Sequence, residues 1–447
     1  MNQQRFPTDP QEQVSARSAS AQEPLGRKKS RRPRWPFALA VVILLTLVAV
    51  AGNVLAPLSA APVVHFATAT PPPIATQRAA NTSATPLPDY LREQAEITYV
   101  NGLISKMSLN EEIGQMVMIG FSETQMDAAL AYQIQQLHVG SAIIYDNASA
   151  PNIQNGPQLT ALISGMQADA SIPLLVATDQ EGGSVNRMQT IIGPTPSAWS
   201  IGATNNPSVA KQRGVQDANA LASVGINLNL APDVDVLQTP GGAGDIGSRS
   251  FGSTPQLVTK MAGAYLDGLQ SSGKVVGTLK HFPGLGDVPV DPHQTLYTLN
   301  RSLSQLNAVD WAPYKALIGQ GDVYAVMSTH IILSAVDPAM PASLSYKDLT
   351  GVLRDQLGFN GVVITDGIYM QALSAYGLDQ IAVDAVAAGN DIICSTYSIQ
   401  STQEVITALH NAVSSGKITK SRIDDSVRRI LLLKLRLGLL PAPQFQS

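Results

Sequence analysis

Eight short apolar runs divide most of this 447-residue chain, and longer helix-compatible stretches fill the intervals between them. Most of these runs lack the polar alternation of a half-exposed strand, which is typical of parallel strands buried on both faces. They cover residues 114–121, 140–145, 174–178, 226–236, 275–279, 325–329, 361–365 and 391–395. Eight buried strands alternating with helices predict an α/β fold of the (β/α)8 TIM-barrel type, with an open doubly wound sheet as the alternative.

Helical patterns between and after these runs support the same fold. Residues 207–224 and 254–272 are helix-compatible, and a last helix is expected over residues 421–437. That helix has one apolar stripe, and Gly438 is a residue of the type that commonly follows the end of a helix. The stripe consists of Ile423, Val427, Ile430 and Leu431.

The N-terminal region predicts a membrane anchor. Six Lys or Arg residues within positions 27–34 precede an uncharged stretch at 37–56, which as a helix would be roughly 30 Å long, the thickness of a bilayer core. Basic residues before the span predict a cytoplasmic N-terminus and an extracytoplasmic body. A cleaved signal peptide, which would leave a secreted protein, is the alternative, although Pro62 directly follows its small-residue cleavage site.

Composition then divides the chain into segments. We expect a basic cytoplasmic tail at 1–35, a transmembrane signal anchor at 36–57 and an extracytoplasmic linker at 58–90, rich in Pro, Ala and Thr. The catalytic barrel is expected at 91–441 and a short tail at 442–447.

Charge and cysteine content exclude several classes of partner and site. The first 35 residues carry eight Lys or Arg against three acids, while the whole chain has a net charge of −4. The body is therefore acidic and has no electrostatic reason to bind nucleic acid. Cys394 is the only cysteine, so an intrachain disulfide and a cysteine-based zinc site are excluded.

Ionisable residues follow the predicted strands where a TIM barrel carries its active site. Because catalytic groups of such barrels lie at the carboxyl ends of the strands, these residues should converge on one rim. In chain order they are Asp179 and Glu181, Asp233 and Asp235, Lys280 and His281, His330, and Asp366.

The loop KHFPGLGDVPVDPH, residues 280–293, holds the densest group. Pro292 favours an extended backbone at Asp291, which lets the Asp291 carboxylate reach the His293 imidazole within one loop. A histidine oriented by an aspartate can move a proton. A solvated loop with an incidental histidine is the alternative interpretation.

Asp366 ends the strand of GVVITDG with no Lys or Arg beside it in sequence. An acid fixed at a rigid strand end can act as a nucleophile or a base, or can simply cap the following helix.

Four strings in this order resemble the successive motifs of glycoside hydrolase family 3, and specifically its single-barrel bacterial β-N-acetylglucosaminidases. They are TDQEGGSVNR, DIGSRSFG, KHFPGLGDVPVDPH and GVVITDGIYM. The resemblance spans roughly residues 93–440, and it implies a TIM barrel that hydrolyses terminal β-linked GlcNAc with retention, without a metal or another cofactor.

The resemblance also implies roles for individual residues. Asp366 matches the nucleophile that forms a glycosyl-enzyme, and His293 with Asp291 matches the acid/base dyad that this branch uses instead of a carboxylic acid. Glu181 is expected to support the glycine turn. Five further residues match positions that hold hydroxyls of the terminal sugar, namely Asp179, Arg187, Arg249, Lys280 and His281.

Three positions depart from the family pattern. Pro292 stands where the family usually has Ser or Thr, Gly367 where a second acid commonly follows the nucleophile, and Leu285 where a histidine is frequent. None of these departures removes a proposed catalytic atom. Pro292 stiffens a loop that is thought to move during catalysis in this branch.

Other functions remain open at this point. A phosphorylase or a β-glucosidase of the same family would use the same residues. A metal-dependent barrel hydrolase would need His281, His293 and His330 together. A membrane-tethered glycan-binding protein without catalysis would bind saccharides and turn nothing over.

Overall fold

The computed structural model describes residues 89–146, 151–238 and 245–442. Its largest sheet has eight parallel strands in the order β11-β9-β7-β6-β3-β2-β1-β12. The two ends of this order meet, since Ile364 of β11 forms a bridge with Ile392, which directly precedes β12. The strands are β1 (Val117–Gly120), β2 (Ser141–Ile144), β3 (Leu175–Thr178), β6 (Leu228–Asn229), β7 (Val276–Phe282), β9 (Ala325–Ser328), β11 (Val362–Thr365) and β12 (Ile393–Thr396). The predicted TIM barrel is confirmed.

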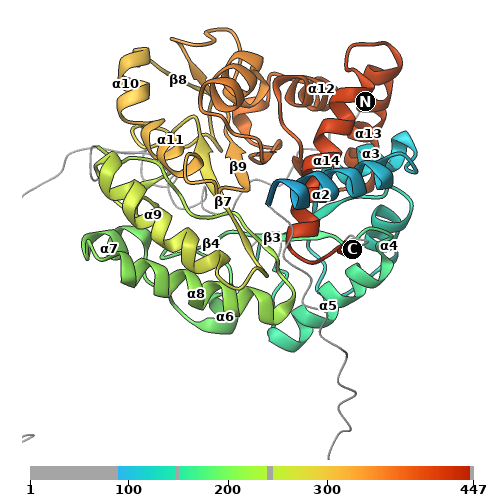
Figure 1. Ribbon diagram of the computed structural model, residues 1–447, viewed down its shortest axis with the longest axis horizontal. Helices are drawn as coiled ribbons and strands as arrows, with labels where there is room; N and C mark the ends of the chain where they lie inside the picture. Colours follow the sequence, from blue (N-terminus) through green and yellow to red (C-terminus); the bar gives the residue numbers. More distant parts are fainter. Residues whose placement is uncertain (1–88, 147–150, 239–244, 443–447) are drawn as a thin grey trace, which may run out of the picture. The chain divides into compact units, whose positions relative to one another are not determined.

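Helices surround the barrel, as Figure 1 shows for α8 and α9 outside β7 and β3. The α-helices in the described ranges are α2 (Asp89–Ile104), α3 (Leu109–Gln115), α4 (Ala128–Gln135), α5 (Gly156–Asp169), α6 (Gln189–Ile192), α7 (Ala198–Ala203), α8 (Pro207–Val224), α9 (Pro255–Gln270), α10 (Leu303–Ala308), α11 (Ala312–Ile318), α12 (Leu378–Ala388), α13 (Ile399–Ser414) and α14 (Lys420–Arg436). A π-helical segment, η4 (Lys347–Gln356), lies between β9 and β11, and the short 3-10 helices are η2 (Gly247–Arg249), η3 (Ala342–Leu344) and η5 (Gln371–Leu373).

All eight predicted strands exist with bounds that differ from the predicted ones, and the differences at two strands bear on the site. The run at 226–236 forms regular strand only at Leu228–Asn229, because Pro232 has no N–H to donate to the ladder. The run at 275–279 extends to Phe282, so that Lys280 and His281 lie on β7 rather than in a loop. Their side chains are therefore fixed by the barrel itself.

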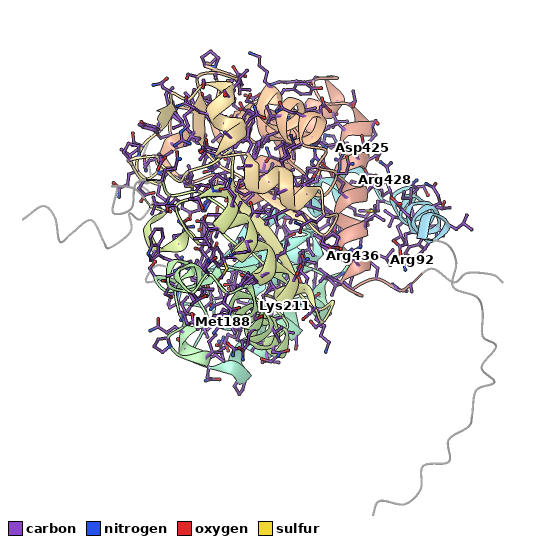
Figure 2. All side chains as sticks on the ribbon, turned by 60° about the vertical axis from the view of Figure 1, so that its left-hand side comes forward. Arg92, Met188, Lys211, Asp425, Arg428 and Arg436 are labelled. Atoms are coloured by element: carbon purple, nitrogen blue, oxygen red, sulfur yellow. The ribbon has the colours of Figure 1, made fainter. Side chains whose placement is uncertain are left out.

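Local sequence explains the helix ends. Pro207 occupies the first turn of α8 and the Asn206 side chain accepts a hydrogen bond from Ser208 N–H, while Gly225 ends the helix at φ 94°. In α14 the predicted apolar stripe is buried. Arg428 on this helix donates from Nε to Asn101 Oδ1 of α2 at 2.8 Å, and Figure 2 shows Arg428 on the face of α14 that is turned toward α2.

Helices α8 and α9 pack through glycines. A Cβ atom on Gly214 would lie 2.1 Å from the Tyr265 carbonyl oxygen, and one on Gly268 would lie 2.0 Å from that of Lys211. Backbone atoms cannot give way as a side-chain tip can, so these helices approach as closely as they do only with glycine.

We predict that Gly214→Ala destabilises the protein by about 1–3 kcal/mol, the usual effect of overpacking, although alanine is the better helix former. Gly102→Ala is the matched control, since Gly102 lies in α2 with nothing within 4 Å of its Cβ position. The control should raise the melting temperature, and the comparison can be made by thermal denaturation. Equal shifts of the same sign would contradict a packing role for Gly214.

The predicted membrane span at 36–57 lies outside the described residues. Among the residues that are described, no helix is both long and apolar enough to cross a membrane.

Candidate active site

The strand ends bring most of the predicted site residues to one rim of the barrel. Asp179 directly follows β3, Lys280 and His281 lie near the end of β7, and Asp366 directly follows β11. After Asp179 the chain forms a small antiparallel hairpin of β4 (Gln180–Gly182) and β5 (Val185–Asn186). This hairpin brings the Glu181 carboxylate within reach of Lys280 on β7.

A buried ion network occupies the β3–β7 side of the rim. Lys280 Nζ lies 2.6 Å from Asp179 Oδ1 and 2.6 Å from Glu181 Oε1, and only 2% of the Lys280 side chain is exposed. Burial lowers the pKa of Lys280, but the two carboxylates outweigh it and the net shift is upward. Lys280 therefore remains a cation at neutral pH.

Arg249 joins the same network from η2. Its guanidinium donates two hydrogen bonds to Glu181, from Nε to Oε2 at 2.9 Å and from Nη2 to Oε1 at 3.0 Å, and it also pairs with Asp245. Burial raises the pKa of Glu181, but the charges of Arg249 and Lys280 outweigh it and hold this pKa well below its usual range. Glu181 thus links two predicted sugar-binding cations, a larger role than support of a glycine turn.

His281 has partners at both ring nitrogens. Its Nδ1 lies 2.7 Å from Asp235 Oδ2, and its Nε2 lies 2.9 Å from Arg249 Nη2. Because a guanidinium can only donate, Nε2 accepts and the proton resides on Nδ1. His281 is therefore held between Asp235 and Arg249, with 4% of its surface exposed.

Asp366 is held as an anion at the end of β11. Its Oδ1 accepts from Gly367 N–H at 2.8 Å and its Oδ2 accepts from Thr329 Oγ1 at 3.2 Å. Burial raises its pKa, but the neighbouring imidazoles and the hydrogen bond from the Gly367 N–H outweigh burial and lower it to about 2. A carboxylate with so low a pKa is ionised throughout the physiological range.

Asp291 and His293 form the predicted pair. Asp291 Oδ1 accepts from the His293 backbone N–H at 2.8 Å and lies 2.8 Å from His293 Nδ1. Burial lowers the pKa of His293, but the hydrogen bond to Asp291 and the charges of Asp366 and Asp245 raise it to about 9. The imidazolium is therefore protonated at neutral pH, and its Nε2 is the nitrogen left for a substrate.

Two hydrogen-bonding atoms near the site lack partners. Arg187 Nε and Asp233 Oδ2 are buried with no hydrogen-bond partner among the described residues. Arg187 does not join the Lys280 network, although its charge acts on Asp146 at the end of β2. Burial and the neighbouring charge of Asp235 raise the pKa of Asp233 well above its usual value.

Sequence reasoning missed two roles. Asp245 pairs with Arg249 and lies close enough to His293 to raise the pKa of that imidazole. Asp235 accepts from the Leu285 N–H at 2.6 Å as well as from His281. The only sequence signal was that both aspartates lie in or beside rim motifs. Leu285 itself is buried, which explains an apolar residue where the family often has histidine.

Potential metal ligands do not group as the metal-dependent alternative requires. In the described ranges, two sets could bring three ligand atoms together, namely Asp233, Asp235 and His281, and Asp245, Asp291 and His293. Neither set contains two of the three histidines His281, His293 and His330.

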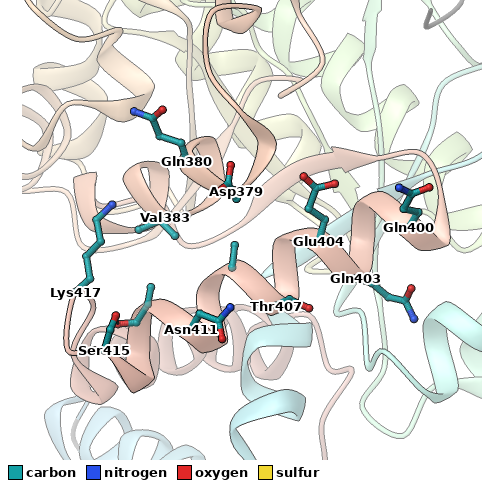
Figure 3. Close-up of a pocket in the computed structure, with 12 residues that line it drawn as sticks. Asp379, Gln380, Val383, Gln400, Gln403, Glu404, Thr407, Asn411, Ser415 and Lys417 are labelled. Carbon is teal, nitrogen blue, oxygen red and sulfur yellow. The ribbon is translucent and has the colours of Figure 1, made fainter. Parts of the chain in front are cut away.

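A separate groove of about 830 Å³ lies outside the barrel, between α12 and α13. Figure 3 shows Asp379 and Gln380 on one wall and Glu404, Thr407 and Asn411 on the other. None of the predicted site residues lines it.

Comparison with known proteins decides the family. Residues 108–433 match the sequence profile described as "Glycosyl hydrolase family 3 N terminal domain". The chain belongs to glycosyl hydrolase family 3. Within the family it is 31% identical over 329 residues to a β-hexosaminidase of Nitrosomonas eutropha, covering 71% of this chain and 91% of that protein. It is also 32% identical over 352 residues to an uncharacterized secreted glycosyl hydrolase of Arthroderma benhamiae, covering 77% of this chain and 98% of that protein.

A solved family 3 structure agrees with these sequence matches. The β-N-acetylglucosaminidase from Paenibacillus sp. str. FPU-7 superposes with a TM-score of 0.70 and 36% sequence identity. The match covers 76% of this chain and 65% of that one, so the Paenibacillus chain has further regions beyond the shared part.

Proposed function

We propose that this family 3 protein is a retaining, exo-acting β-N-acetylglucosaminidase that removes terminal β-linked GlcNAc from cell-wall fragments or chitooligosaccharides. The observation that carries the proposal is the pairing of an ionised strand-end carboxylate, Asp366, with a protonated imidazole, His293, on the same rim. Similarity to a β-hexosaminidase and to a β-N-acetylglucosaminidase supports GlcNAc as the sugar.

In the first step Asp366 attacks the anomeric carbon while the bond to the leaving oxygen breaks. His293 gives its Nε2 proton to that oxygen, because Nδ1 is occupied by Asp291. The product is a glycosyl ester of Asp366 and the free aglycone.

In the second step water attacks the same carbon and His293 Nε2 takes a proton from it. The C–O bond to Asp366 breaks, the carboxylate is restored and the sugar leaves with its original configuration. Two inversions give net retention.

The buried network holds the terminal sugar in this proposal. Lys280, Arg249 and Asp179 would hydrogen-bond its hydroxyls, a kind of site that loses much binding when one hydroxyl is missing. His281 would act through Arg249, since both of its ring nitrogens have protein partners. Arg187, whose Nε has no hydrogen-bond partner among the described residues, is proposed to complete the set.

The proposal is tested by comparing the 4-nitrophenyl β-glycosides of GlcNAc, glucose and xylose as substrates. The GlcNAc glycoside should be preferred, and His293→Ala should be much slower than the parent. A preference for glucose would make the protein a β-glucosidase. Saccharide binding without any turnover would make it a glycan-binding protein.

The pH profile reports on the dyad. With an unactivated disaccharide, kcat/KM should be flat up to about pH 9 and fall above it, because His293 must be protonated to act as the acid. Asp291→Asn removes a charge that raises the pKa of His293, so the alkaline limb should move down by roughly one to two units. Asp355→Asn, an exposed change, should leave the limb in place. An unmoved limb in Asp291→Asn would count against His293 as the acid.

A phosphorylase is the close variant, because an imidazole acid/base repels phosphate less than a carboxylate would. Undiminished activity after phosphate is omitted from the assay would exclude it.

We also propose that the barrel acts outside the cytoplasm, anchored through residues 36–57. The secreted relative supports an extracytoplasmic location. Protease added to intact cells that express the full chain should degrade the barrel, and a protected barrel would contradict this location.

A further inference from the structure

Three tyrosines line the part of the rim that the ion network leaves free. Tyr145 follows β2, Tyr397 follows β12, and Tyr369 lies three residues after Asp366. The rings of Tyr145 and Tyr397 are stacked with centroids 5.9 Å apart, and Tyr369 meets Tyr397 edge-on at 5.0 Å. We call these three residues the tyrosine wall.

The tyrosine wall presents aromatic surface to solvent. Tyr369 and Tyr397 are 43% and 42% exposed, whereas Tyr145 is buried behind them and its hydroxyl lies 2.8 Å from Ser395 Oγ. Adjoining exposed rings beside an active site are typical of a binding surface rather than of a scattered hydrophobic residue.

Two glycines make room for the exposed rings. A Cβ atom on Gly367 would lie 2.5 Å from Tyr369 Cε1, and a Cβ atom on Gly120 would lie 2.7 Å from Tyr397 Cε1. Both contacts are far shorter than a carbon–carbon van der Waals distance. The departure at Gly367, where the family commonly has an acid, thus has a physical reason, because any side chain there would displace the Tyr369 ring.

The wall also lies beside the proposed acid. The Gln371 N–H donates to the His293 carbonyl oxygen at 3.1 Å, and Tyr369 is only two residues before Gln371. The loop that carries Tyr369 therefore connects the nucleophile to the residue that protonates the leaving group.

The geometry of a β-glycoside indicates which part of the substrate contacts the tyrosine wall. The leaving group of a β-linked pyranose is equatorial at C1, across the ring from C4. In the network, Asp179 follows β3 and Lys280 lies on β7. The two exposed rings of the wall, Tyr369 and Tyr397, follow β11 and β12, which lie across the closed barrel from β3 and β6. A terminal sugar held by the network therefore directs its aglycone toward the wall.

We propose that Tyr369 and Tyr397 form a subsite for a pyranose ring in the leaving group, so that the preferred substrates are oligosaccharides rather than glycosides of small alcohols. The C–H face of a pyranose packs on an aromatic ring, and the phenol hydroxyl can bond its hydroxyls. This inference rests on the proposed cleavage of β-glycosides.

The test is the ratio of kcat/KM for N,N′-diacetylchitobiose to kcat/KM for methyl β-GlcNAc, which has no ring in its leaving group. Tyr369→Ala and Tyr397→Ala should each lower this ratio about tenfold, whereas Tyr397→Phe keeps the ring and should largely restore it. Gly367→Asp should lower the ratio as well, although it keeps both tyrosines. Tyr346→Ala, at an exposed tyrosine directly before η4, is the control and should leave the ratio unchanged.

The proposed subsite would be overturned if the ratio were unchanged in both alanine variants, even if kcat/KM fell equally for the two substrates. If the parent prefers glucosides, the same ratio is measured with cellobiose and methyl β-glucoside. The subsite is then tested even though GlcNAc is not the terminal sugar. If the parent turns nothing over, calorimetry should show that both alanine variants weaken disaccharide binding about tenfold relative to monosaccharide binding. Equal weakening, or none, again overturns the subsite.

Discussion

Asp366→Asn is expected to abolish hydrolysis of every β-glycoside that the parent cleaves, with kcat/KM falling roughly a thousandfold or more. The asparagine keeps the size of the side chain but removes the negative charge that attacks the anomeric carbon. Asp366 is the only acidic residue between residues 356 and 378, so no neighbour in that loop can replace it. The measurement is steady-state kinetics with 4-nitrophenyl β-GlcNAc.

Asp355→Asn, at an exposed carboxylate, is the matched control and should retain parental activity.

In His293→Ala, the proton-transfer group is lost but the nucleophile remains. This variant should accumulate a glycosyl ester on Asp366 that mass spectrometry of the intact protein detects. An active Asp366→Asn protein, or an adduct on another residue, would refute the assignment of the nucleophile.

Lys280→Met is expected to destabilise the fold by about 3–5 kcal/mol and to remove activity, because it leaves a buried cation site empty. Asp179 and Glu181 would then lose the cation that lies 2.6 Å from each of them. Arg249 would still compensate Glu181 but would not reach both carboxylates. Urea denaturation followed by tryptophan fluorescence measures the loss.

Lys417→Met is the control, since the Lys417 side chain is 58% exposed and its pair with Asp384 is 3.4 Å long. Exposed pairs contribute about 0–1 kcal/mol, so the control should unfold close to the parental midpoint. Asp179→Asn combined with Lys280→Met should recover part of the lost stability, because it removes the carboxylate that Arg249 does not compensate. Equal effects of Lys280→Met and Lys417→Met would show that the network is not a buried one.

The fold was predictable because its signals are local. Buried parallel strands appear as unbroken apolar runs, and each of the eight runs forms a strand. Helix α8 was predictable at both ends because Pro207 and Gly225 are themselves the start and stop signals. Strand bounds were less predictable at Pro232 and at Lys280, where pairing depends on the neighbouring strand rather than on the residues of the run.

The Asp291–His293 pair was predictable for the same reason. The two residues are separated only by Pro292, so the carboxylate reaches both the backbone N–H and the ring of His293 within one turn. Sequence alone therefore determined the barrel, the strand-end position of Asp366, the local dyad and the resemblance to family 3.

Only the tertiary structure decided which charges compensate one another. Lys280 and Asp179 are 101 positions apart, and Arg249 and Glu181 are 68 apart, so their contacts exist only because β3, β7 and η2 converge on the barrel rim. The tyrosine wall likewise joins side chains from the segments that follow β2, β12 and β11. Periodicity and motifs in the sequence indicate which residues of each segment are buried. Contacts between distant segments depend instead on how the closed barrel brings the strand ends together.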